Sequence, residues 1–401
     1  MATEQQSVNR ILIVHNRYRE QGGEDVVYAA EASMLARYGH EVRQLEFSND
    51  EIDDQRSGVE SFRLAVDTIW SRSAAVRIRT AVREMRAEVV HFHNTFPLVS
   101  PSAYGAARAE GATIVQTIHN YRLLCANALF FRDGRPCEDC VGKTPPWPGI
   151  VHSCYRDSRS QTAVTAAMLT AHRIRGTWRR DVDSYIALTE FSRRKLLLAG
   201  IPENRIAVKP NFLLDDPGIG HSDGDYVLFV GRLTIDKGIE TLLQAAQRTP
   251  FALRIAGVGP LTPQVEAAAA DTPGITYLGR LSQEEVFRQM HSARALIFPS
   301  VWYETFGMTI VEAFACGLPV IASRLGTMAE IIEDNETGLF FEAGNAEDLV
   351  AKIRWIGNHP GEARRMGQRA RQVFIERFTL DRNYHRLMEI YALARVSNAG
   401  G

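Results

Sequence analysis

The chain has 401 residues, of which 45% are hydrophobic and 23% are charged. This composition is ordinary for a soluble globular protein and excludes a largely disordered or fibrous chain, while the length favours two domains. The 46 basic and 47 acidic residues leave a net charge of −1, which argues against nucleic-acid binding through overall attraction. No run approaches the roughly 18 apolar residues of a membrane span, and residues 1–9 are polar, unlike a signal peptide. We therefore expect a cytoplasmic protein.

The first half of the sequence alternates short apolar segments with amphipathic ones. The unbroken apolar run over residues 11–14 is typical of a strand that a parallel sheet buries on both faces. A helix is expected over 26–38, and further strands are expected near 41–42, 89–93, 113–117, 184–188 and 206–208. Strands that alternate with helices predict a parallel, doubly wound sheet.

The segment 211–225 interrupts this alternation. It contains Gly, Pro, Asp and Ser with few apolar residues, and we interpret it as part of an interdomain linker. Beyond it, strands are expected at 226–230, 253–256, 275–278, 295–298, 320–322 and 339–341, and only helical periodicity remains after Leu380. We therefore predict an α/β protein with a first Rossmann-like domain over 1–212, a linker over 213–224, a second such domain over 225–380 and a helical tail over 381–401.

Two cations follow the first strand of the second domain. Gly231 and Arg232 come directly after this strand, and Lys237 lies five residues beyond the arginine. In open α/β sheets, ligands bind at the carboxyl ends of the strands. A planar guanidinium and a point-like ammonium at that edge can meet a diphosphate. We favour phosphate binding over a merely solvated loop.

A second polar segment leads into a helix that is expected over about 307–316. It contains Glu304, Phe306, Gly307 and Met308, and the helix itself carries Glu312. The first backbone N–H groups of a helix suit an anion, and two carboxylates placed before and inside the helix can address different parts of one ligand. The alternative is that Glu304 caps the helix and Glu312 faces solvent.

The order and spacing of these motifs resemble the retaining family-four glycosyltransferases, which have the GT-B fold: two tandem Rossmann-like domains with a cleft between them. In chain order the motifs are Gly231-Arg232, Asp236-Lys237-Gly238, Gly257-Val258-Gly259, Glu304-Thr305-Phe306-Gly307, Glu312 and Gly317-Leu318-Pro319. The first domain is similar more weakly, through Gly22-Gly23, His119-Asn120 and Lys209-Pro210-Asn211. The stretch Leu325-Gly326-Thr327 departs from the family, which often has a second glycine there. The resemblance implies a tail after Leu380 that returns to the first domain.

The resemblance also implies a role for each residue of the second domain. Arg232 and Lys237 would bind the diphosphate of a sugar nucleotide, with backbone donors around Gly307 and Met308. Glu304 would contact hydroxyls of the transferred sugar, and Glu312 the nucleotide ribose. The base pocket would be lined by Gly257 to Pro260, which includes Gly259.

In the first domain, His119 follows the strand expected over 113–117, at the edge where ligands bind. The resemblance implies that His119 reaches the donor sugar near the reacting carbon, and that Gly22 and Gly23 approach the phosphate or the acceptor. His91 and His93 lack further metal-ligand spacing, and we treat them as structural or acceptor-side residues.

The predicted reaction needs no divalent metal. Negative charge develops on the departing diphosphate, and fixed cations stabilise that charge without reorganising. Two Asp-x-Asp pairs that could hold a metal, Asp181-Val182-Asp183 and Asp223-Gly224-Asp225, precede strands, so we interpret them as structural. Retention of anomeric configuration is implied by the resemblance, and the expected acceptor is a polysaccharide, a glycolipid or a lipid-linked saccharide.

Four of the five cysteines fall within thirty residues, in an insertion over about 122–158: Cys125, Cys137, Cys140 and Cys154. Four thiolates could hold a structural zinc ion. Only one Cys-x-x-Cys pair is present, so plain reduced thiols are an equal alternative. The expected cytosolic location argues against structural disulfides.

Other functions fit the sequence less well. A sugar-nucleotide epimerase of the GT-B fold would share the donor motifs but form an epimer, and a phosphorylase would need a pyridoxal lysine. A nucleic-acid-binding module would use the cysteines and an Arg-rich stretch, but aromatic residues interleave poorly with its charges. The stretch is also a candidate for contact between a protein at the inner face of the cell membrane and anionic lipid; it contains Arg173, Arg175, Trp178, Arg179 and Arg180.

Overall fold

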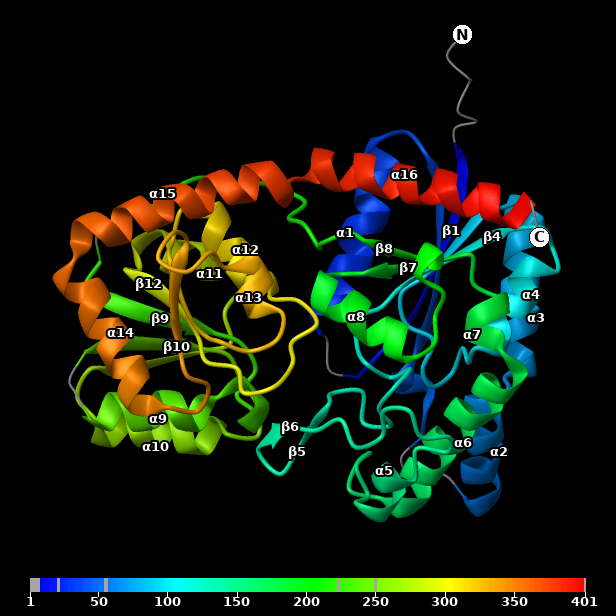
Figure 1. The fold of residues 1–401 in the computed structure, drawn as a ribbon, viewed down its shortest axis with the longest axis horizontal. Helices are drawn as coiled ribbons and strands as arrows, with labels where there is room; N and C mark the ends of the chain where they lie inside the picture. Colours follow the sequence, from blue (N-terminus) through cyan, green and yellow to red (C-terminus); the bar gives the residue numbers. More distant parts are fainter. Residues whose placement is uncertain (1–7, 20–21, 54–56, 222–223, 249–250, 400–401) are drawn as a thin grey trace, which may run out of the picture. The chain divides into compact units, whose positions relative to one another are not determined.

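The computed structural model describes residues 8–19, 22–53, 57–221, 224–248 and 251–399. The chain forms two compact units (Figure 1). The first contains residues up to Phe130, Glu138–Leu214 and Leu380 onward, and the second contains Phe131–Cys137 and Asp215–Thr379. The cysteine-containing insertion is therefore divided: its hairpin of β5 (Phe131–Arg132) and β6 (Arg135–Pro136) is grouped with the second unit, whereas the sequence placed the whole insertion in the first.

The first unit is built on a six-stranded parallel sheet in the order β2-β1-β3-β4-β7-β8. Its strands are β1 (Arg10–Arg17), β2 (Glu41–Ser48), β3 (Val89–Phe92), β4 (Thr113–Thr117), β7 (Ser184–Ala187) and β8 (Ile206–Val208). Its helices are α1 (Gly23–Arg37), α2 (Gly58–Ile69), α3 (Arg72–Met85), α4 (Ser102–Arg108), α5 (Trp147–Val151), α6 (Arg159–Arg175), α7 (Thr177–Arg180), α8 (Glu190–Leu198) and α16 (Leu380–Ala399).

The second unit repeats this architecture with a parallel sheet in the order β11-β10-β9-β12-β13-β14. Its strands are β9 (Tyr226–Val230), β10 (Ala252–Ala256), β11 (Ile275–Gly279), β12 (Ala295–Phe298), β13 (Val320–Ser323) and β14 (Gly338–Phe341). Its helices are α9 (Ile239–Arg248), α10 (Thr262–Asp271), α11 (Gln283–Ser292), α12 (Met308–Ala315), α13 (Met328–Ile331), α14 (Ala346–Asn358) and α15 (Pro360–Arg377).

Both sheets reverse their strand order once. In the first sheet β1 lies between β2 and β3, and in the second β9 lies between β10 and β12. The loops that follow the two strands at a reversal run in opposite directions and leave a crevice at the carboxyl edge, where ligands bind in such sheets. The two tandem Rossmann-like sheets predicted from the sequence are therefore present, each with one such position.

Helix α16 completes the core of the first unit. Its residues Leu387, Ile390 and Tyr391 are buried in one apolar cluster with Ile11 and Ile13 of β1, which α1 also covers. The opposite face of the sheet carries a separate apolar cluster to which α3 and α4 contribute. The last helix of the chain is thus part of the first unit's hydrophobic core.

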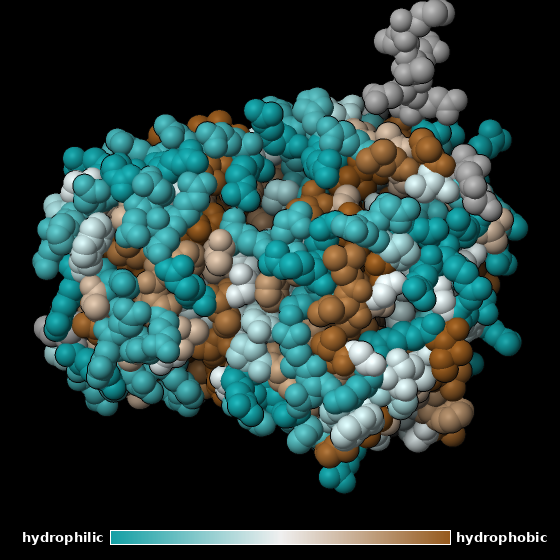
Figure 2. Space-filling view, viewed as in Figure 1, coloured by the Kyte–Doolittle hydropathy of each residue, from teal (hydrophilic) through white to brown (hydrophobic). Residues whose placement is uncertain are grey.

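One apolar stripe stays on the surface of the first unit. Val59, Phe62 and Val66 recur along α2 and are 80%, 72% and 46% exposed. Figure 2 shows apolar residues on the surface at the lower right, where α2 and α6 lie. In the part of the chain that the structure describes, no helix combines the length and the apolar character needed to span a membrane.

The packing of α16 predicts the effect of a core substitution. Ile390 is 1% exposed and Leu393, on the same helix, is 66% exposed. We expect Ile390→Ala to lower the free energy of unfolding by about 3 kcal/mol because it leaves a cavity, and Leu393→Ala to change it by less than about 0.5 kcal/mol. Urea unfolding of the full chain, followed by circular dichroism, measures both. Equal effects would contradict the packing described.

Candidate active site

An ion pair joins the two loops at the strand reversal of the second unit. Lys237 ends a short 3₁₀ turn (Ile235–Lys237) after β9, and its Nζ lies 2.6 Å from Oε1 of Glu304, in the loop after β12. Ser300 Oγ donates to the same Oε1 at 2.6 Å, and Thr327 Oγ1 donates to the carbonyl oxygen of Glu304 at 2.6 Å. The Glu304 side chain is 5% exposed and that of Lys237 is 19% exposed. The structure thus brings these two predicted site residues together, 67 residues apart in sequence.

Glycines allow the loops around this ion pair to touch through their backbones. Gly238 has a φ of +72°, and a Cβ atom there would lie 1.9 Å from the carbonyl oxygen of Pro299. Gly257, with a φ of +140°, would place a Cβ atom 1.8 Å from the carbonyl oxygen of Gly231. Side chains are excluded at both positions because the left-handed backbone and the contact each require glycine. The predicted base-pocket residue Gly257 therefore adjoins the loop that carries Arg232.

Further predicted site residues lie on the loops and helix of the second unit. Gly307 is the N-cap of α12, so the first-turn N–H groups at Met308 lie at the helix end, a position suited to an anion. The Arg232 side chain is exposed, while Phe306 is buried and contacts the ring of Phe378. Gly259 packs against the backbone of Leu233. This edge of the sheet therefore offers two cations and a helix N-terminus on neighbouring loops.

Glu312 lies within α12, where part of its surface is accessible but its carboxyl group is shielded from water by the surrounding protein. Burial raises the pKa of its carboxyl group to about 7. The side chain therefore changes charge near neutral pH, which is unusual for a glutamate.

In the first unit, His119 follows β4 and lies at the carboxyl edge of the sheet, as the sequence predicted. It lines a pocket together with Asn94, Asn120 and Arg122 and with apolar residues such as Phe96 and Leu123. Its Nε2 lies 3.0 Å from Nδ1 of His93. Gly22 is the N-cap of α1 and Gly23 its first residue, so both lie in the loop after β1, where the first sheet reverses its order.

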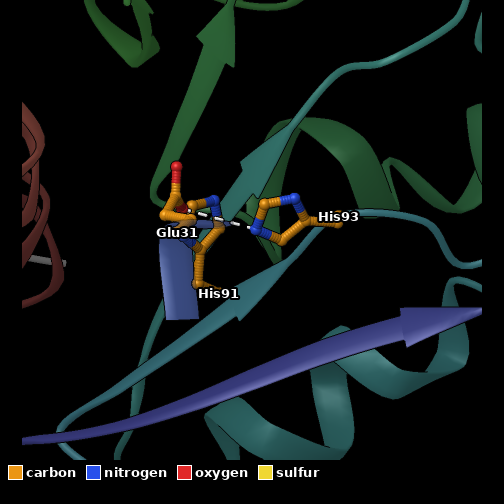
Figure 3. A group of neighbouring side chains, drawn as sticks. All are labelled: Glu31, His91 and His93. Atoms are coloured by element: carbon orange, nitrogen blue, oxygen red, sulfur yellow. Dashed lines mark ion pairs between the residues drawn. The ribbon is translucent and has the colours of Figure 1, made fainter. Parts of the chain in front are cut away.

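Behind His119 lies a buried polar network that the sequence did not reveal. Figure 3 shows Glu31 of α1 facing the rings of His91 and His93. Glu31 Oε1 lies 2.8 Å from His91 Nδ1 and 3.3 Å from His93 Nε2, and Glu31 Oε2 lies 3.0 Å from Lys209 Nζ. The sequence feature that could have pointed to this network is an acidic residue, Glu31, within an apolar stripe of α1 between the buried Tyr28 and Leu35.

Glu31, His91 and His93 are also the one group in the described part of the chain whose ligand atoms could converge on a metal ion. Lys209 already supplies a cation to the carboxylate of Glu31, and a metal ion there would place two cations against one carboxylate in a buried site. We interpret the group as a buried polar network anchored by the Lys209–Glu31 pair.

The other candidate metal ligands in the sequence are the cysteines of the insertion and the two Asp-x-Asp pairs. Among the described residues, no three of the sulfur atoms of Cys125, Cys137, Cys140 and Cys154 all lie within 4.8 Å of one another, and the zinc set stays a prediction. Asp183 accepts from the Ile114 N–H at 2.8 Å and pairs with Arg108 at 2.7 Å. The second Asp-x-Asp pair includes Asp223, which lies outside the described residues.

The Arg-rich stretch is less exposed than its sequence indicates. Trp178 is 5% exposed, and Arg173 donates to the carbonyl oxygens of Leu123 and Lys143. The apolar bulk of Trp178 therefore packs inside, and Arg173 satisfies loop carbonyls. Arg175, Arg179 and Arg180 are exposed.

Two consecutive Rossmann-like units, with polar loops at their strand reversals and a last helix that returns to the first unit, define a GT-B class of protein. Family models agree with this class. Residues 216–373 match the model described as "Glycosyl transferases group 1", and residues 22–211 match the model described as "Glycosyl transferase 4-like domain". Each unit of the chain thus matches a glycosyltransferase model, and the resemblance that its motifs predicted is confirmed.

Named relatives share part of the chain. The D-rhamnosyltransferase WbpZ of Pseudomonas aeruginosa is 33% identical over 158 residues, which are 38% of this chain and 42% of that protein. The O-antigen chain mannosyltransferase C of Escherichia coli is 29% identical over 171 residues, 42% of this chain and 46% of that protein. The matched part of the chain spans less than half the length of these relatives.

Solved structures match nearly the whole chain. Sucrose-phosphate synthase of Thermosynechococcus elongatus has a TM-score of 0.70 at 17% identity, covering 95% of this chain and 98% of that chain. HepE of Anabaena in complex with UDP has a TM-score of 0.66 at 16% identity, with the same two coverages. At such identities the likeness establishes the fold, and the predicted GT-B fold is confirmed.

The raised pKa of Glu312 predicts how stability depends on pH. This pKa lies near 7 in the folded protein, whereas the ordinary pKa of a glutamate, which the unfolded chain has, is 4.5. At a pH between 4.5 and 7, Glu312 therefore keeps its proton in the folded chain and has lost it in the unfolded chain. The free energy of unfolding therefore falls as the pH rises through this window. We expect Glu312→Gln to reduce the fall by about 2 kcal/mol, measured by urea unfolding at about pH 5 and pH 8. Glu240→Gln, at an exposed position of α9, serves as the control. If the free energy of unfolding of Glu312→Gln fell with pH as steeply as that of the wild type, the raised pKa of Glu312 would be refuted.

Proposed function

We propose that this protein is a retaining glycosyltransferase that moves a sugar from a nucleotide-sugar donor to a polysaccharide, glycolipid or lipid-linked acceptor. The observation that carries the proposal is the Lys237–Glu304 pair at the strand reversal of the second unit. A cation that can bind phosphate and a carboxylate that can bind sugar hydroxyls lie side by side there. A sugar nucleotide carries phosphate and hydroxyl groups next to each other where its sugar joins its diphosphate.

The second unit supplies the donor site in this proposal. Lys237 and Arg232 bind the diphosphate, helped by backbone N–H groups at Gly307 and Met308. As the bond between sugar and phosphate breaks, negative charge grows on the leaving diphosphate, and these fixed groups stabilise it. HepE, which shares the fold, has been solved with UDP, and this supports a nucleotide in such a site.

The rest of the donor is assigned to neighbouring loops. Glu304 accepts hydrogen bonds from hydroxyls of the transferred sugar, and ionised Glu312 accepts from the ribose hydroxyls. Gly257 and Gly259 let the nucleotide base approach the backbone closely. His119 and its polar pocket contribute from the first unit, near the reacting carbon.

The proposed transfer uses no divalent metal and retains anomeric configuration. The cations Lys237 and Arg232 take the charge-stabilising part that a metal could play. Oε1 of Glu304 is engaged by both Lys237 and Ser300, which suits a binding carboxylate better than a covalent nucleophile. A front-face displacement fits this arrangement, with the leaving phosphate helping to deprotonate the acceptor hydroxyl.

Removal of one cation tests the donor site. We expect Lys237→Met to lower transfer by about 100-fold or more, because it removes charge stabilisation of the leaving group. A thermal-shift screen with UDP-, GDP- and ADP-sugars first identifies a donor, since a bound donor stabilises the folded chain. Release of the nucleoside diphosphate is then measured in the presence of EDTA, in which the wild type should remain active.

Lys352→Met is the matched control, because Lys352 lies on α14 of the same unit and pairs only with a surface carboxylate, Asp348, at 3.6 Å. It should retain wild-type turnover. A folded Lys237→Met variant with wild-type turnover would refute the proposed donor site.

We also propose that α2 brings the first unit to an anionic membrane that carries a lipid-linked acceptor. The exposed apolar stripe of α2 ends next to Trp70, over whose ring the guanidinium of Arg175 lies at 4.9 Å. Arg63, on α2 itself, is exposed as well. An apolar helix face flanked by cations matches the interface of an anionic bilayer.

Vesicle binding tests this surface. We expect the wild type to co-sediment at low salt with vesicles that contain phosphatidylglycerol, and Phe62→Ser to bind at least about fivefold more weakly because less apolar area is buried. The matched control is Val396→Ser, which changes an apolar residue of α16 that is 74% exposed. Equal binding of both variants, or no binding of the wild type, would remove the membrane proposal.

A further inference from the structure

The loop that carries Glu304 is held by its neighbours on both sides in the sheet. β12 lies between β9 and β13, and the loop after β9 contributes Lys237, whose Nζ lies 2.6 Å from Glu304 Oε1. β13 and the loop after it contribute two hydroxyl groups. Ser323 Oγ donates to the carbonyl oxygen of Ser300, and Thr327 Oγ1 donates to the carbonyl oxygen of Glu304 at 2.6 Å. One neighbour therefore holds the loop by charge, and the other holds it by its backbone.

The hydroxyl group of Thr327 has an unusual partner for its position. Thr327 is the N-cap of α13, where a threonine side chain commonly accepts from a backbone N–H of the first turn. Thr189 does so at the start of α8, where it accepts from the N–H of Ser192. Among the described residues Thr327 makes no such cap, because its backbone is already helical, with a φ of −65° and a ψ of −27°. Its fully buried hydroxyl group donates to Glu304 instead.

The ion pair with Lys237 cannot by itself keep Glu304 in place during transfer. In the proposed function Lys237 also binds the diphosphate, so its ammonium group is shared between two anions. The Lys237 side chain is 19% exposed and the Glu304 side chain is 5% exposed, so the lysine is the partner with room to turn toward a ligand. A carboxylate that stays behind in a buried position needs other contacts. Ser300 Oγ supplies one to Oε1, and Thr327 holds the backbone of the same residue.

We propose that Thr327 is a positioning residue, which acts through Glu304 and keeps its carboxylate at a fixed place while Lys237 turns to the diphosphate. The inference rests on the proposed function for what Glu304 and Lys237 bind. It also gives a task to the stretch 325–327, which departs from the family's pattern. The hydrogen bond between the two loops depends on the side chain of Thr327, so the positioning is a property of this chain's own residue.

Indole N–H signals of the full chain, labelled with nitrogen-15 tryptophan and free of ligand, test the Thr327–Glu304 hydrogen bond. Trp302 lies two residues before Glu304 in the sequence, and the centre of its ring lies 5.3 Å from Lys237 Nζ. Trp302→Phe identifies its signal by loss. Thr327→Val removes the hydroxyl group and keeps the shape of the side chain. We expect this variant to shift or broaden the Trp302 signal, because the loop loses one of its contacts.

Two further variants control for packing. Thr327→Ser keeps the hydroxyl group and should leave the Trp302 signal near its wild-type position. Thr337→Val is the matched control, because Thr337 is also 0% exposed and its hydroxyl group also bonds to backbone, that of Glu333. Thr337 precedes β14 and so lies at the opposite edge of the sheet. An unchanged Trp302 signal in folded Thr327→Val, or an equal change in Thr337→Val, would overturn the inference.

Turnover kinetics then test whether Thr327 acts through Glu304. With the donor that the thermal-shift screen identifies, we expect Thr327→Val to lower kcat about tenfold and to change the donor KM by less than about twofold, because a displaced carboxylate fits the transition state less well. Thr327→Ser should stay within about twofold of the wild-type kcat. In a Glu304→Gln background, Thr327→Val should cost less than about twofold, since the group it positions is already gone. A tenfold loss in both backgrounds would overturn the inference.

The donor site and the role of Thr327 fail in different ways. If Lys237→Met is impaired and folded Thr327→Val keeps the wild-type kcat, the donor site stands and the positioning role is refuted. If Lys237→Met turns over like the wild type, the donor site is refuted and Thr327 loses the role that rests on it. The Trp302 signal reports the hydrogen bond in either case, because no ligand is present in that measurement.

Discussion

Parallel pairing is the constraint on which the rest of the molecule depends. It places all carboxyl ends of a sheet at one edge, and a reversal of strand order then sets two loops side by side. In the second unit this brings Lys237 next to Glu304, and in the first it places His119 at the same edge as the N-terminus of α1. The backbone contact between Gly238 and Pro299 shows how closely two such loops pack.

A second constraint is the burial of charge. Removing Glu31 and Lys209 from water carries a desolvation penalty that their attraction offsets only when the surrounding polar groups are satisfied. The partners come from α1, from β3 and the residue after it, from the end of β8 and from α16. The network therefore joins four chain segments, and loss of Glu31 or Lys209 leaves the other charge without compensation.

Most of the fold, and the place of the candidate site residues in the second unit, could be predicted because their signals are local. Apolar runs such as 11–14 mark buried strands, and Arg232, Lys237 and Glu304 lie in loops whose place the strand pattern fixes. Glu31 could not be found in this way, because a buried glutamate depends on Lys209, 178 residues away. The burial of Trp178 and the carbonyl contacts of Arg173 could not be found for the same reason: their partners come from tertiary packing.

The position of α16 has a consequence for biosynthesis. The apolar cluster that contains Ile11 and Ile13 needs Leu387, Ile390 and Tyr391, which the ribosome adds only after the whole of residues 215–379. Until those residues are added, this face of the first unit's sheet has only the cover that α1 gives it, so the first unit depends on the last-made helix to complete its core.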